Sequence, residues 1–376
     1  MPGKRIFLSA GELSGDIHGG HLIRALRAER DDLEFAAIGG DNMHHAGARL
    51  IFHIRDTSFM GLTEVLKHLP FLRRMWRQTL RFIEEYRPQL VILIDYPGFN
   101  LRLARALTKR GIPVVYYICP KVWAWHQARV RQLQHYTKEV ICILPFEVPW
   151  LRKRHVHATY VGNPLLDQPV FQTGYVPPRL ALAKAGQPLV GLFPGSRPEE
   201  VERHINLLVH CVDRLRADFP ELQAVVAGAP GIAAVHLQKR FPQAWLTWLE
   251  GSNYAIMANA DVLIMASGTA TLEATLIGTP YVVIYRVAFL TYLLGRVLIK
   301  VRFISLANLV AGYAGVAELI QQSATVENIT RETRKILRNK SYNQSLRHFL
   351  HDIQRQMGKS GASARAARIA LRYLKD

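Results

Sequence analysis

Runs of branched apolar residues alternate with amphipathic stretches along most of this chain. The clearest run covers residues 90–94, where five consecutive apolar residues predict a strand buried on both faces, as in a parallel sheet. Asp95 follows this run directly, and Pro97-Gly98 predicts a turn after it. Ligands of open α/β sheets bind at the carboxyl ends of the strands, so Asp95 is a candidate catalytic group. A helix-capping or turn aspartate is the alternative.

The first half of the chain repeats this pattern. Further strands are predicted at 6–10, 36–40, 114–118, 140–144 and 160–162, with helices at 21–30 and 102–110. The alternation predicts a doubly wound α/β domain over residues 1–165.

A stretch rich in proline and glycine at 163–187 predicts a linker, after which the alternation resumes. Strands are predicted at 189–193, 224–229, 260–265 and 281–285, with a helix at 199–216. These elements predict a second domain over residues 180–345. The fold class is therefore α/β, with two Rossmann-like doubly wound domains expected to face each other across a cleft.

A glycine-rich loop is predicted at 11–20, between the first strand and a helix at 21–30, with Ser14 or Asp16 as the helix cap. Its glycines do not fit the G-x-G-x-x-G dinucleotide fingerprint, although they would allow a ligand to approach the backbone. Glu12 lies within this loop, where a ligand hydroxyl explains a carboxylate better than packing does.

Two predicted helix starts in the second half carry signals for anion binding. Gly195, Ser196 and Arg197 precede the helix at 199–216, where free backbone N–H groups and a guanidinium favour phosphate. The alternative is a routine strand-to-helix turn with a surface arginine.

Ser267, Gly268 and Thr269 repeat this arrangement at another helix start, and Glu273 follows one turn later, where it could accept the hydroxyls of a ribose. The combination predicts a nucleotide diphosphate ligand.

Two further stretches have both a functional and a structural interpretation. Trp123 and Trp125 follow the strand at 114–118, where they form either a pocket wall or core. Residues 59–77, which include Met60, mix large apolar side chains with arginine and lysine, as in segments that lie on an anionic membrane surface. Two amphipathic helices broken at Pro70 are the alternative.

Charge and composition narrow the choice of partner and compartment. The formal net charge of +19 favours a polyanion, namely nucleic acid, an anionic membrane or phosphorylated substrates. The three cysteines, Cys119, Cys142 and Cys211, lie in or beside apolar runs, as expected in a reducing compartment. We see no signal peptide and no uncharged apolar run long enough to span a bilayer, so a cytoplasmic location is expected.

The sequence lacks the motifs of several kinds of enzyme and metal site. There is no His/Cys cluster with zinc spacing, no G-x-S-x-G elbow and no credible Asp-x-Asp metal motif. We therefore expect a reaction without metal or other cofactor, in which cationic side chains and helix dipoles stabilise the leaving group.

Together, eight stretches resemble the bacterial lipid-A-disaccharide synthase family, which are inverting glycosyltransferases of two-domain GT-B architecture. They follow one another in order over nearly the whole chain, at 10–16, 60–65, 94–100, 120–125, 144–147, 194–197, 266–273 and 305–312.

The resemblance implies a specific reaction. A diacyl-glucosamine would pass from its UDP donor to diacyl-glucosamine 1-phosphate (lipid X), releasing UDP, on the cytoplasmic face of the inner membrane. It also implies that Asp95 is the catalytic base, that Glu12 and Asn308 are needed for activity, and that Arg197 binds the donor. The expected acceptor pocket comprises Ser14, Gly15, Asp16, Met60, Trp123 and Trp125.

By the same analogy, the C-terminal segment 350–376, with a basic helix at 362–375, would return to the first domain. Association into homo-oligomers is left open.

The sequence also departs from the family pattern. Lys121, Asn163, Ala307 and Tyr313 stand where the family usually has Ser, His, Pro and Arg. The missing arginine could weaken phosphate recognition. Two alternatives follow from the sequence: another GT-B enzyme acting on a UDP-sugar (a glycolipid transferase or an epimerase), or a basic nucleic-acid binder, although no RNP, zinc-finger or helix-turn-helix motif is present.

Overall fold

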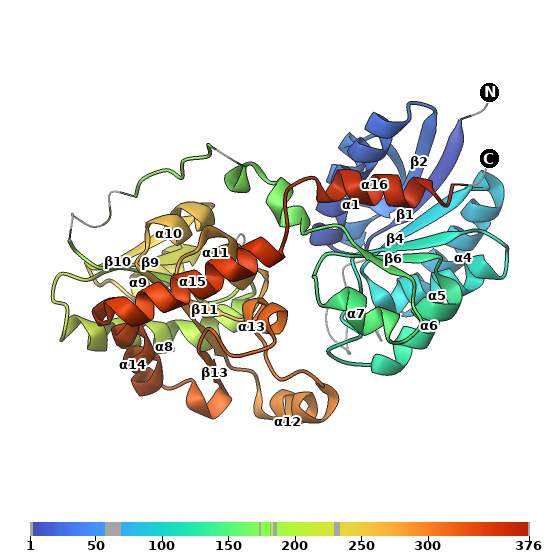
Figure 1. Ribbon diagram of the computed structural model, residues 1–376. Coiled ribbons are helices and arrows are strands. Elements are labelled where there is room, and N and C mark those ends of the chain that lie inside the picture. Colours follow the sequence, from blue (N-terminus) through green and yellow to red (C-terminus); the bar gives the residue numbers. More distant parts are fainter. Residues whose placement is uncertain are drawn as a thin grey trace. The chain divides into compact units, whose positions relative to one another are not determined.

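The computed structural model describes residues 3–56, 69–172, 174–180, 182, 186–228 and 234–374. The chain divides into two compact units (Figure 1), Met1–Asp167 with Lys359–Asp376, and Gln168–Gly358. Each unit is a parallel sheet with helices between its strands, as the sequence predicts.

In the described residues of the first unit, seven parallel strands form one sheet in the order β3-β2-β1-β4-β5-β6-β7. Their bounds are β1 (Lys4–Ser9), β2 (Leu33–Gly39), β3 (Ala48–His53), β4 (Leu90–Ile94), β5 (Val114–Tyr117), β6 (Glu139–Cys142) and β7 (Ala158–Tyr160). All five residues of β4 are buried, which confirms the strand predicted from its apolar run.

The helices described in this unit are α1 (Leu13–Glu29), α2 (Asp41–His45), α4 (Leu69–Tyr86), α5 (Pro97–Thr108), α6 (Val130–Tyr136), α7 (Glu147–Arg152) and α16 (Ala362–Leu371). Helix α4 contains Pro70 at its start. Proline is tolerated there because the N–H groups of the first turn have no intrahelical acceptor. Met60 and most of the segment predicted to lie on a membrane fall outside the described residues.

The predicted glycine-rich loop at 11–20 is wrong, because helix α1 begins at Leu13 and contains Gly15, Gly19 and Gly20. These glycines allow close helix packing. A Cβ at Gly20 would lie 2.7 Å from the carbonyl oxygen of Asn42, and one at Gly15 would lie 3.0 Å from the Cβ of Ala10. Tertiary packing thus outweighs the low helix propensity of glycine.

The described part of the second unit likewise carries a parallel sheet, in the order β10-β9-β8-β11-β12-β13. Its strands are β8 (Leu189–Phe193), β9 (Gln223–Gly228), β10 (Leu246–Glu250), β11 (Val262–Ala266), β12 (Tyr281–Tyr285) and β13 (Glu318–Ile320). The sequence did not predict β3, β10 and β13. All three lie at sheet edges and are largely half-buried, so they lack a continuous apolar run.

The helices described in the second unit are α8 (Pro198–Arg216), α9 (Ala234–Arg240), α10 (Asn253–Asn259), α11 (Thr269–Ile277), α12 (Phe289–Leu298), α13 (Leu306–Ala311), α14 (Val326–Arg338) and α15 (Lys340–Gln356). Among the helices that are described, none is both long and apolar enough to cross a membrane.

Helix α16 completes the core of the first unit. Figure 1 shows it beside α1, and Ala366 and Ala370 join Leu22 and Leu26 in one buried cluster. Helix α15 instead belongs to the second unit, where Gln354 donates hydrogen bonds to two carbonyls at the end of α11. The returning segment therefore begins at residue 359 rather than near 350.

Asp167 fixes the start of α16 from a distant part of the sequence. Its carboxylate accepts hydrogen bonds from the backbone N–H groups of Gly361, Ala362 and Ser363 and from the Ser363 hydroxyl, at 2.5–3.2 Å. Gly361, the N-cap residue, has no side chain that could cap the helix, so Asp167 supplies both the acceptor and a negative charge at the helix start.

We predict that Asp167→Ala loosens α16 by about 1–2 kcal/mol, because the first-turn N–H groups lose their charged acceptor. Amide hydrogen exchange of α16 measures this effect, and Asp213→Ala, an exposed aspartate on α8, is the control. Unchanged protection of α16 in Asp167→Ala would show that the cap does not stabilise the helix.

Candidate active site

The first sheet reverses its strand order between β1 and β4. These two strands are neighbours, yet the chain proceeds from β1 to β2 on one side and from β4 to β5 on the other. The connections therefore diverge, and in open α/β sheets such a divergence marks the carboxyl-end crevice where ligands bind. Glu12 follows β1 and Asp95 follows β4, so the topology brings both candidate carboxylates to this point.

Asp95 lies in a strained backbone segment. Asp95 and Tyr96 both have left-handed conformations, with φ of 42° and 50°, which cost about 1–3 kcal/mol each for residues with side chains. The buried Asn100 compensates, since its amide donates to the carbonyls of Asp95, Ile94 and Ser9 and accepts from the Ser9 hydroxyl. The Tyr116 hydroxyl also donates to the Asp95 carbonyl.

The neighbouring turn after β1 is shaped to fit this segment. The ring of Tyr96 lies against Gly11, where any side chain would collide with it. Asn100 is the last residue of the motif at 94–100, and the motif alone does not predict a positioning role. Its positioning role depends on contacts with β1, which are 91 residues away in the chain.

The surroundings of Asp95 favour its use as a base. Burial raises the pKa of Asp95 to about 6, Lys121 opposes this shift, and the like charge of Glu12 adds to it. A carboxyl group with a pKa near the operating pH can both take up and release a proton, as a general base must. Lys121, one of the departures from the family pattern, thus bears directly on this carboxylate.

The structure places the other residues expected in the first unit differently. Ser14 is exposed in the first turn of α1, but Asp16 is fully buried and caps α2 through the backbone N–H groups of Gly40, Asn42 and Met43, at 2.6–3.1 Å. The carboxylate of Asp16 is therefore occupied in holding the start of α2, and Gly15 packs against Ala10.

The two tryptophans differ in their exposure to solvent. Trp123 is buried, and its indole N–H donates to Glu147, whose carboxylate also accepts from the backbone of Ile143 and Leu144. Trp123 is thus core. Trp125, by contrast, is exposed.

The second sheet reverses in the same way between β8 and β11, and the two predicted anion-binding turns follow these two strands. Gly195 adopts φ of 134°, and Arg197 is the N-cap of α8 with its side chain 57% exposed. Glu200 accepts a hydrogen bond from the Ser196 N–H at 3.1 Å and lies 3.4 Å from Arg197. This turn therefore already binds a carboxylate of its own helix.

His204 connects the turn after β8 to the end of β12, a role that we did not predict. Its Nδ1 lies 2.7 Å from the carbonyl of Pro194, and its Nε2 accepts the N–H of Arg286 at 3.2 Å. This pattern requires a neutral imidazole protonated at Nδ1, and burial lowers the pKa of His204 accordingly. A histidine among the core-facing positions of α8 was the available sequence signal.

The turn after β11 leaves part of its predicted site open. Gly268 and Thr269 are exposed, whereas the Ser267 hydroxyl donates to the carbonyl of Ile304 at 3.3 Å. Glu273 is half-buried on α11, and burial raises its pKa. Its carboxylate accepts a hydrogen bond from Tyr254, which no sequence signal indicated.

Asn308 is fully buried on α13, and its amide is occupied within the protein. It donates to the Val316 carbonyl and to Glu318, and it accepts from the N–H groups of Gly315 and Val316. Asn308 therefore holds the loop at residues 315–316 in place.

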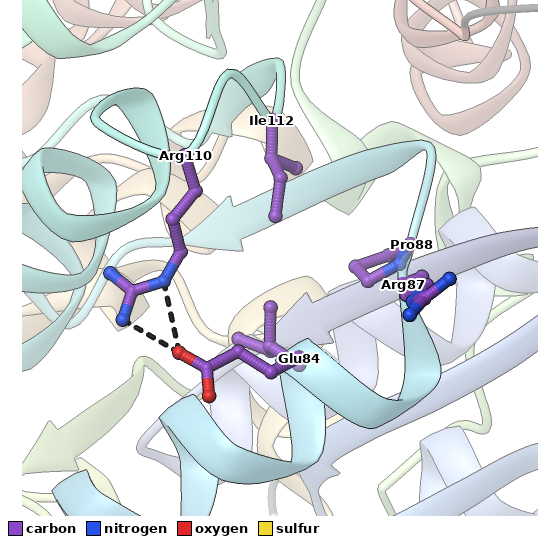
Figure 2. Close-up of a pocket in the computed structure, with 6 residues that line it drawn as sticks. Glu84, Arg87, Pro88, Arg110 and Ile112 are labelled. Atoms are coloured by element: carbon purple, nitrogen blue, oxygen red, sulfur yellow. Dashed lines mark hydrogen bonds and ion pairs between the residues drawn. The ribbon is translucent and has the colours of Figure 1, made fainter.

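A hollow of about 430 Å³ lies at the opposite edge of the first sheet (Figure 2). Arg87 and Pro88 precede β4, Ile112 precedes β5, and Figure 2 shows Arg110 reaching toward Glu84. None of the predicted site residues lines this hollow. Within the described ranges, no group of three or more His, Cys, Asp or Glu residues could hold a metal ion.

Solved structures with a similar fold define the class. The UDP-GlcNAc 2-epimerase from Neisseria meningitidis bound to UDP-GlcNAc has a TM-score of 0.67 at 12% identity, covering 98% of this chain and 100% of that chain. The glycotransferase of kitacinnamycin has a TM-score of 0.67 at 17% identity, covering 99% and 100%. The fold is therefore that of GT-B glycosyltransferases and UDP-GlcNAc epimerases.

Sequence comparison identifies the family. The family model described as lipid-A-disaccharide synthetase matches residues 6–372. The lipid-A-disaccharide synthase of Myxococcus xanthus (strain DK1622) is 40% identical over 375 residues, covering 98% of this chain and 97% of the relative. That of Trichlorobacter lovleyi (strain ATCC BAA-1151 / DSM 17278 / SZ) is 37% identical over 381 residues, covering 98% and 97%. The chain belongs to the lipid-A-disaccharide synthase family, as its motifs indicated.

We predict that two substitutions move the pKa of Asp95 in opposite directions from about 6. Lys121→Met removes a charge that favours the carboxylate and raises the pKa, whereas Glu12→Gln removes a like charge and lowers it. Carbon NMR titration of the Asp95 carboxyl measures both shifts, with exposed Lys109→Met as the control. Shifts in the same direction, or none, would refute this account of the electrostatics.

Proposed function

We propose that this protein transfers a diacyl-glucosamine from UDP-2,3-diacylglucosamine to the 6-hydroxyl of 2,3-diacylglucosamine 1-phosphate (lipid X). The products are UDP and the β-1,6-linked lipid A disaccharide 1-phosphate. The observation that carries the proposal is the family match over residues 6–372, together with the names of its relatives. The first unit would bind the acceptor and the second unit the UDP-sugar.

Asp95 is the proposed base. It would take the proton of the acceptor hydroxyl while that oxygen attacks the anomeric carbon opposite the departing UDP, so that the configuration inverts. Its raised pKa and its place at the strand reversal support this role. Glu12, exposed beside it, would bind a hydroxyl of the acceptor, and Ser14 and Trp125 would border the same substrate.

The leaving UDP would be stabilised without a metal. The proposed diphosphate site is the start of α8, where Gly195, Ser196 and Arg197 offer N–H groups and a guanidinium, and the start of α11 with Gly268 and Thr269. The carboxylate of Glu200 would give way to the diphosphate, since both use the same donors. Glu273 would accept the ribose hydroxyls.

Because the proposed substrates carry acyl chains, we infer that the protein binds peripherally to the cytoplasmic face of the inner membrane. In and just after α12, Leu293, Val297, Leu298 and Ile299 are exposed, and the cationic Arg296 and Lys300 lie among them. In the first unit, α4 separately carries exposed arginines at 73, 74 and 77. Apolar side chains flanked by cations suit binding to anionic lipid.

We expect Asp95→Asn to retain UDP binding and to lose turnover by about 10²–10⁴-fold, because the amide cannot take up the proton. Transfer to lipid X in detergent measures turnover, and exposed Asp31→Asn is the control. Turnover near that of the control would exclude Asp95 as the base. Plain UDP-N-acetylglucosamine, tested in parallel, distinguishes an epimerase, which would isomerise it without any acceptor.

We expect the double substitution Val297→Gln/Leu298→Gln to weaken binding to anionic vesicles at least tenfold, since each buried aliphatic side chain contributes about 1.5–3 kcal/mol. Vesicle sedimentation measures the binding. Val176→Gln removes another exposed aliphatic side chain outside this patch and serves as the control. Equal binding by all three proteins would remove α12 from the membrane contact.

A further inference from the structure

The hydroxyl of Tyr254 lies between two polar side chains from separate parts of the second unit. It is 2.8 Å from Oε1 of Glu273 on α11 and 2.7 Å from the side-chain oxygen assigned to Gln168. Gln168 is the first residue of this unit, where the chain leaves the first unit. Tyr254 itself comes from α10, which packs against α11.

The number of available protons decides which group donates in each of these two hydrogen bonds. A phenol has one proton and cannot donate to two oxygens at once. Burial and the adjacent Glu273 raise the pKa of Tyr254, so the phenol stays protonated, and its hydrogen bond opposes the rise in the pKa of Glu273. The phenol therefore donates to the carboxylate. The phenol oxygen can then only accept from Gln168, which requires the amide to be turned by 180° so that its NH₂ group, rather than its oxygen, faces Tyr254.

The surroundings hold this chain of hydrogen bonds in place. The ring of Phe171 packs edge-on against Tyr254, with centroids 5.6 Å apart and planes at 80°. Phe171 ends the short helical turn Pro169–Phe171, directly after Gln168. The segment that enters the unit thus fixes both the ring and the hydroxyl of Tyr254.

One oxygen of Glu273 is held, and the other is left for a ligand. Among the hydrogen bonds of the described residues, none reaches Oε2 of Glu273, which lies one turn into the helix that begins at the exposed Gly268 and Thr269. A carboxylate fixed through one oxygen presents the other in a defined direction, at a smaller cost in side-chain entropy when it binds.

We propose that Tyr254, supported by Gln168, is a positioning residue that orients Glu273 for the ribose hydroxyls of the donor nucleotide. This inference rests on the proposed function, in which the second unit binds a UDP-sugar. It adds that recognition of the ribose depends on the segment that connects the two units. Tyr254 is not a catalytic residue, because it acts through Glu273.

The test compares UDP with 2′-deoxy-UDP, using isothermal titration calorimetry on the full-length protein. We expect Tyr254→Phe to weaken UDP binding about fivefold to tenfold while changing 2′-deoxy-UDP binding much less, so that the preference for UDP falls. A merely structural substitution would weaken both nucleotides equally, and an unchanged preference would overturn the inference.

Two further variants sharpen the result. In a Glu273→Gln background, Tyr254→Phe should cause no additional loss of preference, because the two residues act as one unit. Gln168→Leu, which removes only the supporting donor, should lower the preference in the same direction and by less. If Tyr254→Phe does not fold, Gln168→Leu decides the matter alone, and an unchanged preference there would count against the proposal.

The controls separate this inference from the proposed function. Tyr342→Phe removes another tyrosine hydroxyl near a glutamate, Glu332 at 3.5 Å, and should change neither affinity. Arg197→Ala should weaken the binding of both nucleotides to the same degree, because the proposed partner of Arg197 is phosphate, which both nucleotides carry. If Arg197→Ala and Glu273→Gln leave UDP binding unchanged, the donor site itself is wrong. If Arg197→Ala and Glu273→Gln weaken UDP binding but Tyr254→Phe leaves the preference for UDP over 2′-deoxy-UDP unchanged, only the proposed role of Tyr254 is wrong.

Discussion

The candidate site depends on a constraint of chain topology. In each sheet, the first strand lies in the interior of the sheet and the chain later returns to its other side, so that β1 neighbours β4 and β8 neighbours β11. The connections leave these paired strands in opposite directions, the arrangement at which open α/β sheets bind ligands beyond the carboxyl ends of the strands. Glu12 and Asp95 follow one pair, while Arg197 and Gly268 follow the other. Within each unit, the two residues are far apart in sequence, and the reversal of the strand order brings them to the same edge of their sheet.

Local strain and burial then determine the surroundings of Asp95 at this edge. Two consecutive left-handed residues, Asp95 and Tyr96, turn the chain sharply out of β4, and the buried amide of Asn100 stabilises that turn. The same turn keeps the Asp95 carboxylate partly out of water, which raises its pKa. In the second unit, His204 plays the corresponding structural part, because it joins the turn after β8 to the end of β12.

The sequence predicted the central strands and the two-unit organisation because continuous apolar runs mark strands that are buried on both faces. It missed β3, β10 and β13, since edge strands lack such runs. The glycines of α1 were predicted to form a loop, whereas they allow close packing against residues that are distant in sequence. Asp16 and Asn308 carry motif positions but are buried in hydrogen-bond networks, which local sequence does not reveal. Tyr254 was missed because its contact with Glu273 depends on how α10 packs against α11.

Backbone NMR during a titration with UDP tests most directly whether the strand reversal defines the donor site. If the account is correct, the largest amide shifts occur at residues 195–197 and 267–269, the turns after β8 and β11. Residues 84–88 and 110–112, around the hollow at the amino-terminal edge of the first sheet, should not respond. Shifts concentrated at that edge, or none at the two turns, would contradict the account.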